Sequence, residues 1–126
     1  MDEHVLNPDL EEDLWIRAME LEREGRLEEA LKLYLEICER EEDLVLSAIS
    51  LLSAAKCAVK LGRTEEAMKL FGDAGKKYES FARSSEKTSP NIAKWAYGMA
   101  SRCYQLAGDI NSFLSLLRKS GIPDEK

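Results

Sequence analysis

A ten-residue phrase occurs twice in this chain and constrains the fold more than any other feature. Residues 25–34 read Gly-Arg-Leu-Glu-Glu-Ala-Leu-Lys-Leu-Tyr, and residues 62–71 read Gly-Arg-Thr-Glu-Glu-Ala-Met-Lys-Leu-Phe. Glycine permits the left-handed backbone of a tight chain reversal, and the paired glutamates favour the positively polarised start of a helix. A phrase used twice therefore predicts a structural unit used more than once.

Apolar periodicity and turn signals predict six helices, paired across breaks at Gly25, Gly62 and Gly108. The expected helices cover residues 8–24, 27–40, 43–61, 65–83, 90–106 and 110–119. The residues expected to cap or begin helices are Asn7 with Pro8, Thr64, Ser89 with Pro90, and Asp109. The expected organisation is a short acidic lead-in at 1–7, one domain at 8–120 with hairpins at about 8–40, 43–83 and 90–119, and a tail at 121–126.

Two of these expected helices have unusual sequences. Thirteen of the 18 residues from 44 to 61 are apolar, so this helix should be central, with neighbours on both flanks. Its polar residues form one narrow stripe: Ser47, Ser50, Ser53, Lys56 and Lys60. The helix at 65–83 contains Gly72 and Gly75, each of which costs about 1 kcal/mol relative to alanine. Those glycines predict the close approach of another backbone, or a slight bend.

Each turn glycine is flanked by similar residue types at fixed offsets. A small residue lies seven positions before it in all three pairs: Ala18, Ala55 and Ser101. Five and nine positions after it, the first two pairs have alanine and an aromatic residue: Ala30 with Tyr34, and Ala67 with Phe71. The third pair departs from this pattern with Phe113 and Leu117.

This arrangement resembles the tetratricopeptide repeat (TPR) from about residue 10 to residue 120, strongly in the first two pairs and more weakly in the third. No repeat ends in that family's proline, and the glycine spacings of 37 and 46 residues are irregular, somewhat as in proteins of the soluble NSF-attachment-protein type. The resemblance implies an all-α fold: a right-handed α–α superhelix (solenoid) of three TPR-like helical hairpins.

Members of that family bind peptides or helices in a concave groove lined by the first helix of each hairpin. Carried over by register, the groove residues here would be Glu12, Trp15, Met19, Ile49, Leu52, Ser53, Lys56, Lys60, Trp95, Arg102 and Gln105. The family's clamp for a C-terminal carboxylate is absent, since its positions hold Trp15, Met19, Ser53, Trp95 and Met99. Two tryptophans, a methionine and a few cations instead suit an amphipathic partner helix. The alternative is that Trp15 and Trp95 are partly buried core residues.

The charge distribution limits the classes of partner. Net charge is −6, with −11 in residues 1–43 and +5 in residues 44–126. An acidic total argues against nucleic-acid binding, which requires a basic footprint. The asymmetry is compatible with a charged partner, with head-to-tail self-association, or with solvated helix faces alone.

No catalytic, metal or cofactor site is expected. The one histidine, His4, lies near the N-terminus, and Cys38, Cys57 and Cys103 are far apart without a CxxC pair. Runs of carboxylates at helix starts are more often caps than acid–base groups. The first residues lack the features of a signal peptide, the longest uncharged run has 12 residues, and cysteines in apolar patterns favour a reducing compartment. We therefore expect a cytoplasmic, non-enzymatic protein without membrane insertion.

The sequence thus predicts a protein–protein interaction module, an adaptor or scaffold that presents a groove to a peptide or helix. The alternative is a structural protein that associates with itself, because a repeat array needs polar caps at its ends and only a short tail follows the last helix. Its candidate self-association face is Phe113, Leu114 and Leu117. That helix could instead simply expose its polar side, and a small helical enzyme with converging carboxylates is a third possibility.

Overall fold

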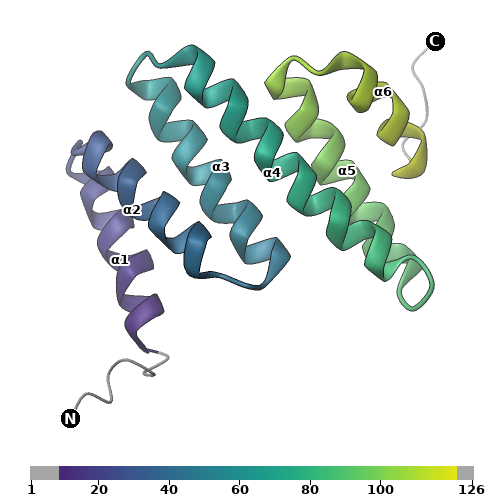
Figure 1. Cartoon of the computed structure of the whole chain (residues 1–126), viewed down its shortest axis with the longest axis horizontal. Coiled ribbons are helices and arrows are strands. Elements are labelled where there is room, and N and C mark those ends of the chain that lie inside the picture. Colours follow the sequence, from purple (N-terminus) through teal and green to yellow (C-terminus); the bar gives the residue numbers. More distant parts are fainter. Residues whose placement is uncertain (1–8, 122–126) are drawn as a thin grey trace.

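The computed structural model describes residues 9–121, which form six helices and no strand. The helices are α1 (Asp9–Arg23), α2 (Leu27–Arg40), α3 (Leu44–Lys60), α4 (Thr64–Ser85), α5 (Pro90–Ala107) and α6 (Ile110–Lys119). Each packs mainly against the helices before and after it in the chain, so that they lie side by side in one row from α1 to α6 (Figure 1). The predicted all-helical class is confirmed, and the predicted helix ends agree with the observed ones to within two residues. The predicted start of the first helix at Asn7 and Pro8 lies outside the described residues.

The three predicted glycine turns have the same geometry. Gly25, Gly62 and Gly108 have φ values of 82°, 80° and 83°, the left-handed conformation that glycine adopts without strain. In each turn the residue after the glycine donates its backbone N–H to the carbonyl oxygen five positions earlier, always at 2.9 Å. This is the pattern that closes a helix with a left-handed residue, and it explains why the helices begin and end where the phrase recurs.

Caps account for some helix starts but not for all of them. Asp43 accepts from the backbone N–H groups of Val45 and Leu46 at 2.9 and 3.0 Å, and Asp109 accepts from Ser112 at 3.1 Å as predicted. The prediction that Thr64 caps α4 is wrong, because Thr64 is already its first helical residue and the preceding residue makes no side-chain cap. Ser89 precedes the expected Pro90 start but also makes no side-chain cap.

The central position of α3 between α2 and α4 is confirmed, although its stripe of polar residues does not face solvent throughout. Ser47 and Ser50 are almost completely buried. The Ser50 hydroxyl donates to the Ser47 carbonyl at 2.9 Å, and the Ser47 hydroxyl lies 3.2 Å from the Cys38 thiol of α2. These serines let neighbouring helices approach α3, and larger side chains such as Ile49 are left exposed instead.

Gly75 marks the close approach that the sequence predicted. A Cβ atom built at Gly75 would lie 3.2 Å from Cys103 Cβ and 3.3 Å from the Tyr104 ring, both on α5. A Cβ at Gly72 would lie 3.6 Å from Ala107 Cβ, an ordinary contact. The contact between α4 and α5 therefore depends on a missing side chain at Gly75 but not at Gly72.

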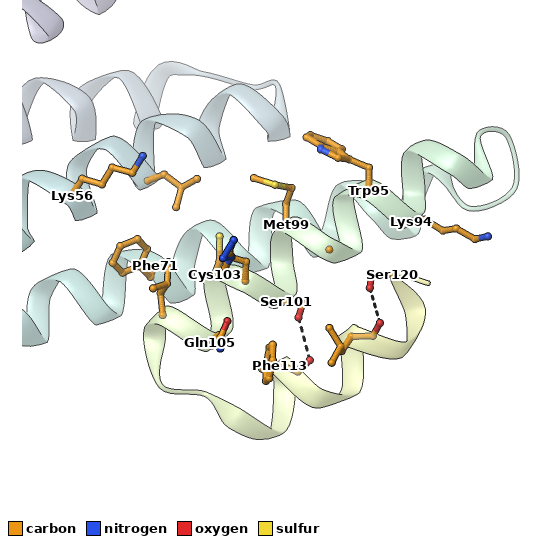
Figure 2. Close-up of a pocket in the computed structure, with 15 residues that line it drawn as sticks. Lys56, Phe71, Lys94, Trp95, Met99, Ser101, Cys103, Gln105, Phe113 and Ser120 are labelled. Carbon is orange, nitrogen blue, oxygen red and sulfur yellow. Dashed lines mark hydrogen bonds between the residues drawn. The ribbon is translucent and has the colours of Figure 1, made fainter. Parts of the chain in front are cut away.

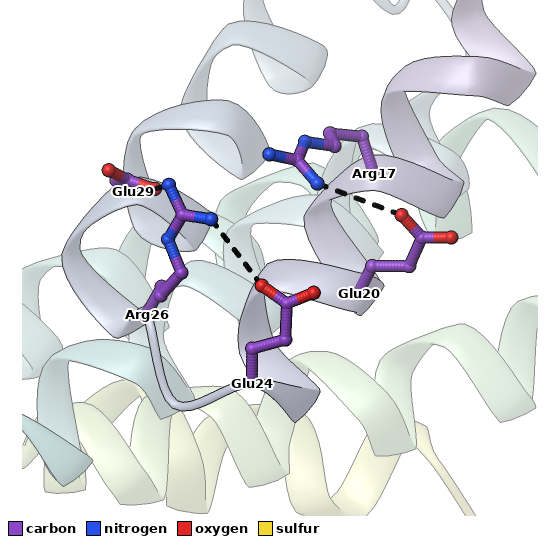
Figure 3. Close-up of polar contacts among 5 residues, drawn as sticks. All are labelled: Arg17, Glu20, Glu24, Arg26 and Glu29. Atoms are coloured by element: carbon purple, nitrogen blue, oxygen red, sulfur yellow. Dashed lines mark hydrogen bonds and ion pairs between the residues drawn. The ribbon is translucent and has the colours of Figure 1, made fainter.

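The repeated phrase also repeats an ion pair. Arg26 contacts Glu29 at 2.6 Å and Glu24 at 3.5 Å (Figure 3). The equivalent Arg63 lies 3.7 Å from Glu66, and it also reaches back 3.0 Å to Glu28 of the first phrase. The hydrogen bond from Arg63 lowers the pKa of Glu28. Exposed pairs contribute little to stability because solvent screens them, so they reinforce the register of the hairpins rather than create it.

Buried tyrosines join successive helices through glutamates. The Tyr34 hydroxyl of α2 donates to Glu22 of α1 at 2.8 Å, and the Tyr104 hydroxyl of α5 donates to Glu79 of α4 at 2.7 Å. Tyr97 of α5 likewise donates to Glu86, which follows α4. Burial and the hydrogen bond to Glu86 raise the pKa of Tyr97 to about 12. Each hydroxyl therefore keeps its proton at neutral pH and remains a donor.

Candidate partner-binding pocket

A pocket of about 800 Å³ lies over α5, between α3 on one side and α6 on the other (Figure 2). Most of its lining residues come from α5, and Phe71 of α4 also lines it. The lining residues are Leu52, Lys56, Phe71, Lys94, Trp95, Gly98, Met99, Ser101, Arg102, Cys103, Gln105, Leu106, Phe113, Leu117 and Ser120.

Small residues of α5 leave the space that forms the pocket. Gly98 has no side chain, and Ser101, one turn later on the same side of the helix, is buried. The Ser101 hydroxyl donates to the Phe113 carbonyl of α6 at 3.3 Å, which fixes the short last helix beside α5 (Figure 2). The pocket therefore exists because α6 is held against a face of α5 that it does not fill.

Two exposed apolar side chains lie in this pocket. Trp95 is 49% exposed, and its ring packs edge-on against Tyr78 with centroids 5.8 Å apart. Leu106 is also 49% exposed, three turns further along α5. A tryptophan held in place by one ring contact while half of its surface remains open is a typical anchor for an apolar ligand group.

The charged side chains of the pocket are all positive. Lys56, Lys94 and Arg102 are exposed, and no Asp or Glu is among the lining residues. Within residues 9–121, none of these three cations forms an ion pair, in contrast to Arg26, Arg63 and several others. Lys94 and Arg102 lie eight residues apart on α5, or about 12 Å along its axis. The pocket thus combines an apolar surface with cations that have no carboxylate of their own.

The structure brings together some of the predicted groove residues. Those that line the pocket are Leu52, Lys56, Trp95, Arg102 and Gln105. Those that do not line it are Trp15, Met19, Ile49, Ser53 and Lys60, and the Glu12 side chain lies outside the described residues. Trp15 packs against Tyr34 at a centroid distance of 5.9 Å, and Lys60 pairs with Glu22 at 3.6 Å. The pocket therefore includes one of the two tryptophans of the predicted groove.

The predicted self-association face is divided in the same way. Phe113 and Leu117 line the pocket, whereas Leu114 is not among the lining residues and is 53% exposed. The lining residues that the sequence did not assign to a site are Phe71, Lys94, Gly98, Met99, Ser101, Cys103, Leu106 and Ser120. Gly98 and Ser101 are small residues three apart on α5, but this helix also contains four alanines, so the spacing did not single out the pocket.

The titratable groups of the pocket are three cations and one thiol. Burial raises the pKa of the Cys103 thiol to about 12, so that it stays protonated at neutral pH. Cys57, outside the pocket, is similar, with burial raising its pKa to about 11. No group of three or more His, Cys, Asp or Glu residues that could hold a metal ion occurs in the described range. The pocket offers apolar contact and positive charge rather than a pair of groups for proton transfer.

Comparisons with protein-family models, with curated proteins and with solved structures gave no match for this chain. Among residues 9–121, no helix combines the length and apolar character needed to cross a membrane.

Proposed function

We propose that this chain is a non-catalytic protein–protein interaction module, an adaptor or scaffold that holds a segment of a partner protein in the pocket over α5. The observation that carries this proposal is the half-exposed Trp95 in an apolar pocket bordered by Lys56, Lys94 and Arg102. Pockets of this size and character suit a peptide or one face of a helix.

The proposal includes a tetratricopeptide-like architecture, a right-handed superhelix of three hairpins. Three glycine turns with the same hydrogen bond, at Gly25, Gly62 and Gly108, support it. The repeated ion pairs Arg26–Glu29 and Arg63–Glu66 support it further, since equivalent positions make equivalent contacts. In such an array the first helices of the hairpins line one surface. Helices α3 and α5 would be the first helices of the second and third hairpins, and both contribute residues to the pocket.

The bound segment should be acidic and amphipathic. Apolar side chains would contact Trp95 and Leu106, and Asp or Glu residues on either side would reach Lys94 and Arg102. Because the cations are exposed, they would contribute more to the rate of association and to specificity than to affinity. A protonated Cys103 at the base of the pocket favours binding over covalent chemistry, and three free thiols agree with a reducing, cytoplasmic location.

The test is the selection of peptides from a random displayed library on the immobilised protein, followed by titration of the enriched peptides in solution. We expect enriched peptides to share bulky apolar residues flanked by carboxylates. Trp95→Ala should weaken their binding by about tenfold or more, as truncation of a buried aromatic anchor does. Added salt should weaken binding moderately.

Trp15→Ala is the matched control, because it removes the other tryptophan–tyrosine contact without changing the pocket. Circular dichroism would establish that both variants are folded at the titration temperature. Peptides that bind wild type and Trp95→Ala equally well would show that their site lies elsewhere and would refute the proposal.

A structural protein that associates with itself is the second candidate, because α6 exposes Ile110 and Leu114, each at 53%.

A further inference from the structure

The described chain leaves its last helix at the rim of the pocket. Ser120, which follows α6, is one of the lining residues (Figure 2), and a Cβ atom built at Gly98 of α5 would lie 3.6 Å from Ser120 Cβ. A Cβ atom at Gly121 would lie 3.6 Å from Cδ and 4.0 Å from Cε of Lys94, another lining residue. The chain therefore enters residues 122–126 from a point beside Lys94.

Gly121 has the conformation of the three turn glycines. Its φ is 80°, and its backbone N–H donates to the carbonyl oxygen three residues earlier at 3.2 Å. The three turn glycines have φ values of 80° to 83° and make the same hydrogen bond at 3.0 to 3.1 Å. After each of them the chain reverses and packs along the helix that it has just left. A fourth reversal, at Gly121, would send the chain back along α6 on the side where Lys94 and the pocket lie.

The sequence that follows has the composition that the pocket suits. Residues 122–126 read Ile-Pro-Asp-Glu-Lys, so a bulky aliphatic side chain stands close to two carboxylates. The charged lining residues of the pocket are Lys56, Lys94 and Arg102, without an Asp or Glu among them. Lys126 is the one residue of the segment with the same charge as the pocket, and it comes after both carboxylates.

The segment is also long enough to span the pocket. The Cα atoms of Gly121 and Glu125 can lie at most about 14 Å apart. Lys94 and Arg102 are about 12 Å apart along the axis of α5, and Trp95 lies between them in the sequence. A segment that starts beside Lys94 can therefore carry its carboxylates along α5 as far as Arg102.

We infer that residues 122–126 bind in the pocket of their own chain, with Ile122 against Trp95 and the two carboxylates facing the pocket cations. The inference rests on the proposed function, since the segment would compete with the partner for the same site. A tethered segment has an effective concentration in the millimolar range. A partner's measured affinity is reduced in proportion to the fraction of molecules whose pocket is open. The segment would thus exclude weak ligands.

The first experiment measures the quenching of Trp95 fluorescence by acrylamide, a neutral quencher. The full chain carries Trp15→Phe, so that Trp95 is the only tryptophan. If the segment covers Trp95 in about half of the molecules, Ile122→Ser should raise the quenching constant by about 1.5- to 2-fold. Leu114→Ser is the matched control, because Leu114 is an aliphatic residue of α6 that is 53% exposed and does not line the pocket. It should leave the quenching constant unchanged.

The second experiment tests the competition. A peptide selected on the immobilised protein is titrated into wild type and into the double variant Asp124→Asn with Glu125→Gln. We expect the double variant to bind the peptide about twofold more tightly, because more of its pockets are open. Glu39→Gln with Glu42→Gln is the control, since it removes the same charge from exposed residues outside the pocket, and it should bind the peptide like wild type.

The two experiments separate this inference from the proposed function. Quenching requires no partner, so it tests the contact between the segment and Trp95 even if no peptide is enriched. Equal quenching of wild type and Ile122→Ser would overturn the inference, and so would equal peptide affinity of wild type and the Asp124→Asn, Glu125→Gln variant. A peptide that binds in the pocket would leave the proposed function standing in either case.

Discussion

At the scale of single residues, the missing side chain at Gly75 determines how closely α4 and α5 can pack. A Cβ atom at this position would lie 3.2 Å from Cys103 Cβ. Cys103 Cβ is bonded to the backbone of α5, so it cannot rotate away. Gly72, one turn earlier in the same helix, would gain a methyl group in an ordinary contact at 3.6 Å. Alanine substitutions at the two glycines therefore share the same gain in helix propensity, and only the one at Gly75 also disturbs the packing against α5.

Gly72→Ala should stabilise the protein by about 0.5–1 kcal/mol, since alanine favours the helix and nothing must move. Gly75→Ala gains the same propensity but must push α4 from α5, and overpacking of this kind costs about 1–3 kcal/mol. We expect Gly75→Ala to be the less stable of the two by about 1 kcal/mol or more in urea unfolding followed by circular dichroism. Equal stability of the two variants would show that α4 and α5 are not in close contact at Gly75.

Several residue-scale contacts could not be predicted from the sequence. The hydrogen bonds from Tyr34 to Glu22 and from Tyr104 to Glu79 join residues 12 and 25 positions apart. They depend on where two helices cross, which periodicity does not specify. The burial of Ser47 could not be predicted either, because a polar residue on a helix is compatible with solvent or with a close helix contact.

At the scale of helices, start signals differ in strength. Asp43 caps α3 through two backbone hydrogen bonds, whereas Thr64, which the sequence suggests as a cap, is inside α4. Because Gly62 already reverses the chain in a left-handed conformation, Arg63 is the residue that precedes the helix, and α4 begins at Thr64.

Asp43→Ala should therefore lower the free energy of unfolding by about 1 kcal/mol, the usual cost of losing a capping side chain. Thr64→Ala should be neutral or slightly stabilising, because alanine has the higher helix propensity. Urea unfolding of both variants would measure the difference. A loss at Thr64→Ala as large as that at Asp43→Ala would show that Thr64 does cap the helix.

The sequence predicts helices well because their ends are local events. Gly25, Gly62 and Gly108 terminate helices through hydrogen bonds within six residues, so their effect can be read from short stretches of sequence. The pocket is different, since it depends on how far α6 covers α5. Helical register was enough to predict Trp95 and Arg102 in a shared site. It could not predict Lys94, Gly98 and Leu106, because their place in the pocket depends on how α6 packs against α5.

At the scale of the whole molecule, charge differs between the two ends of the helix row. The first 43 residues carry a net charge of −11, and α1 at that end exposes Asp13 and Glu20. Helices α5 and α6, which contribute most of the pocket lining, lie at the other end of the row (Figure 1), and residues 44–126 carry a net charge of +5. We therefore expect partners to bind at α5 and α6.

Chemical-shift mapping by NMR with a selected acidic peptide tests the central claim most directly. If the peptide lies over Trp95, the backbone amides of α3, α5 and α6 that surround the pocket should shift as peptide is added, and those of α1 and α2 should remain in place. The Trp95 indole N–H should move more than that of Trp15, which packs against Tyr34 outside the pocket. Shifts confined to α1 and α2 would contradict the account, because they would place the partner on the acidic half of the molecule.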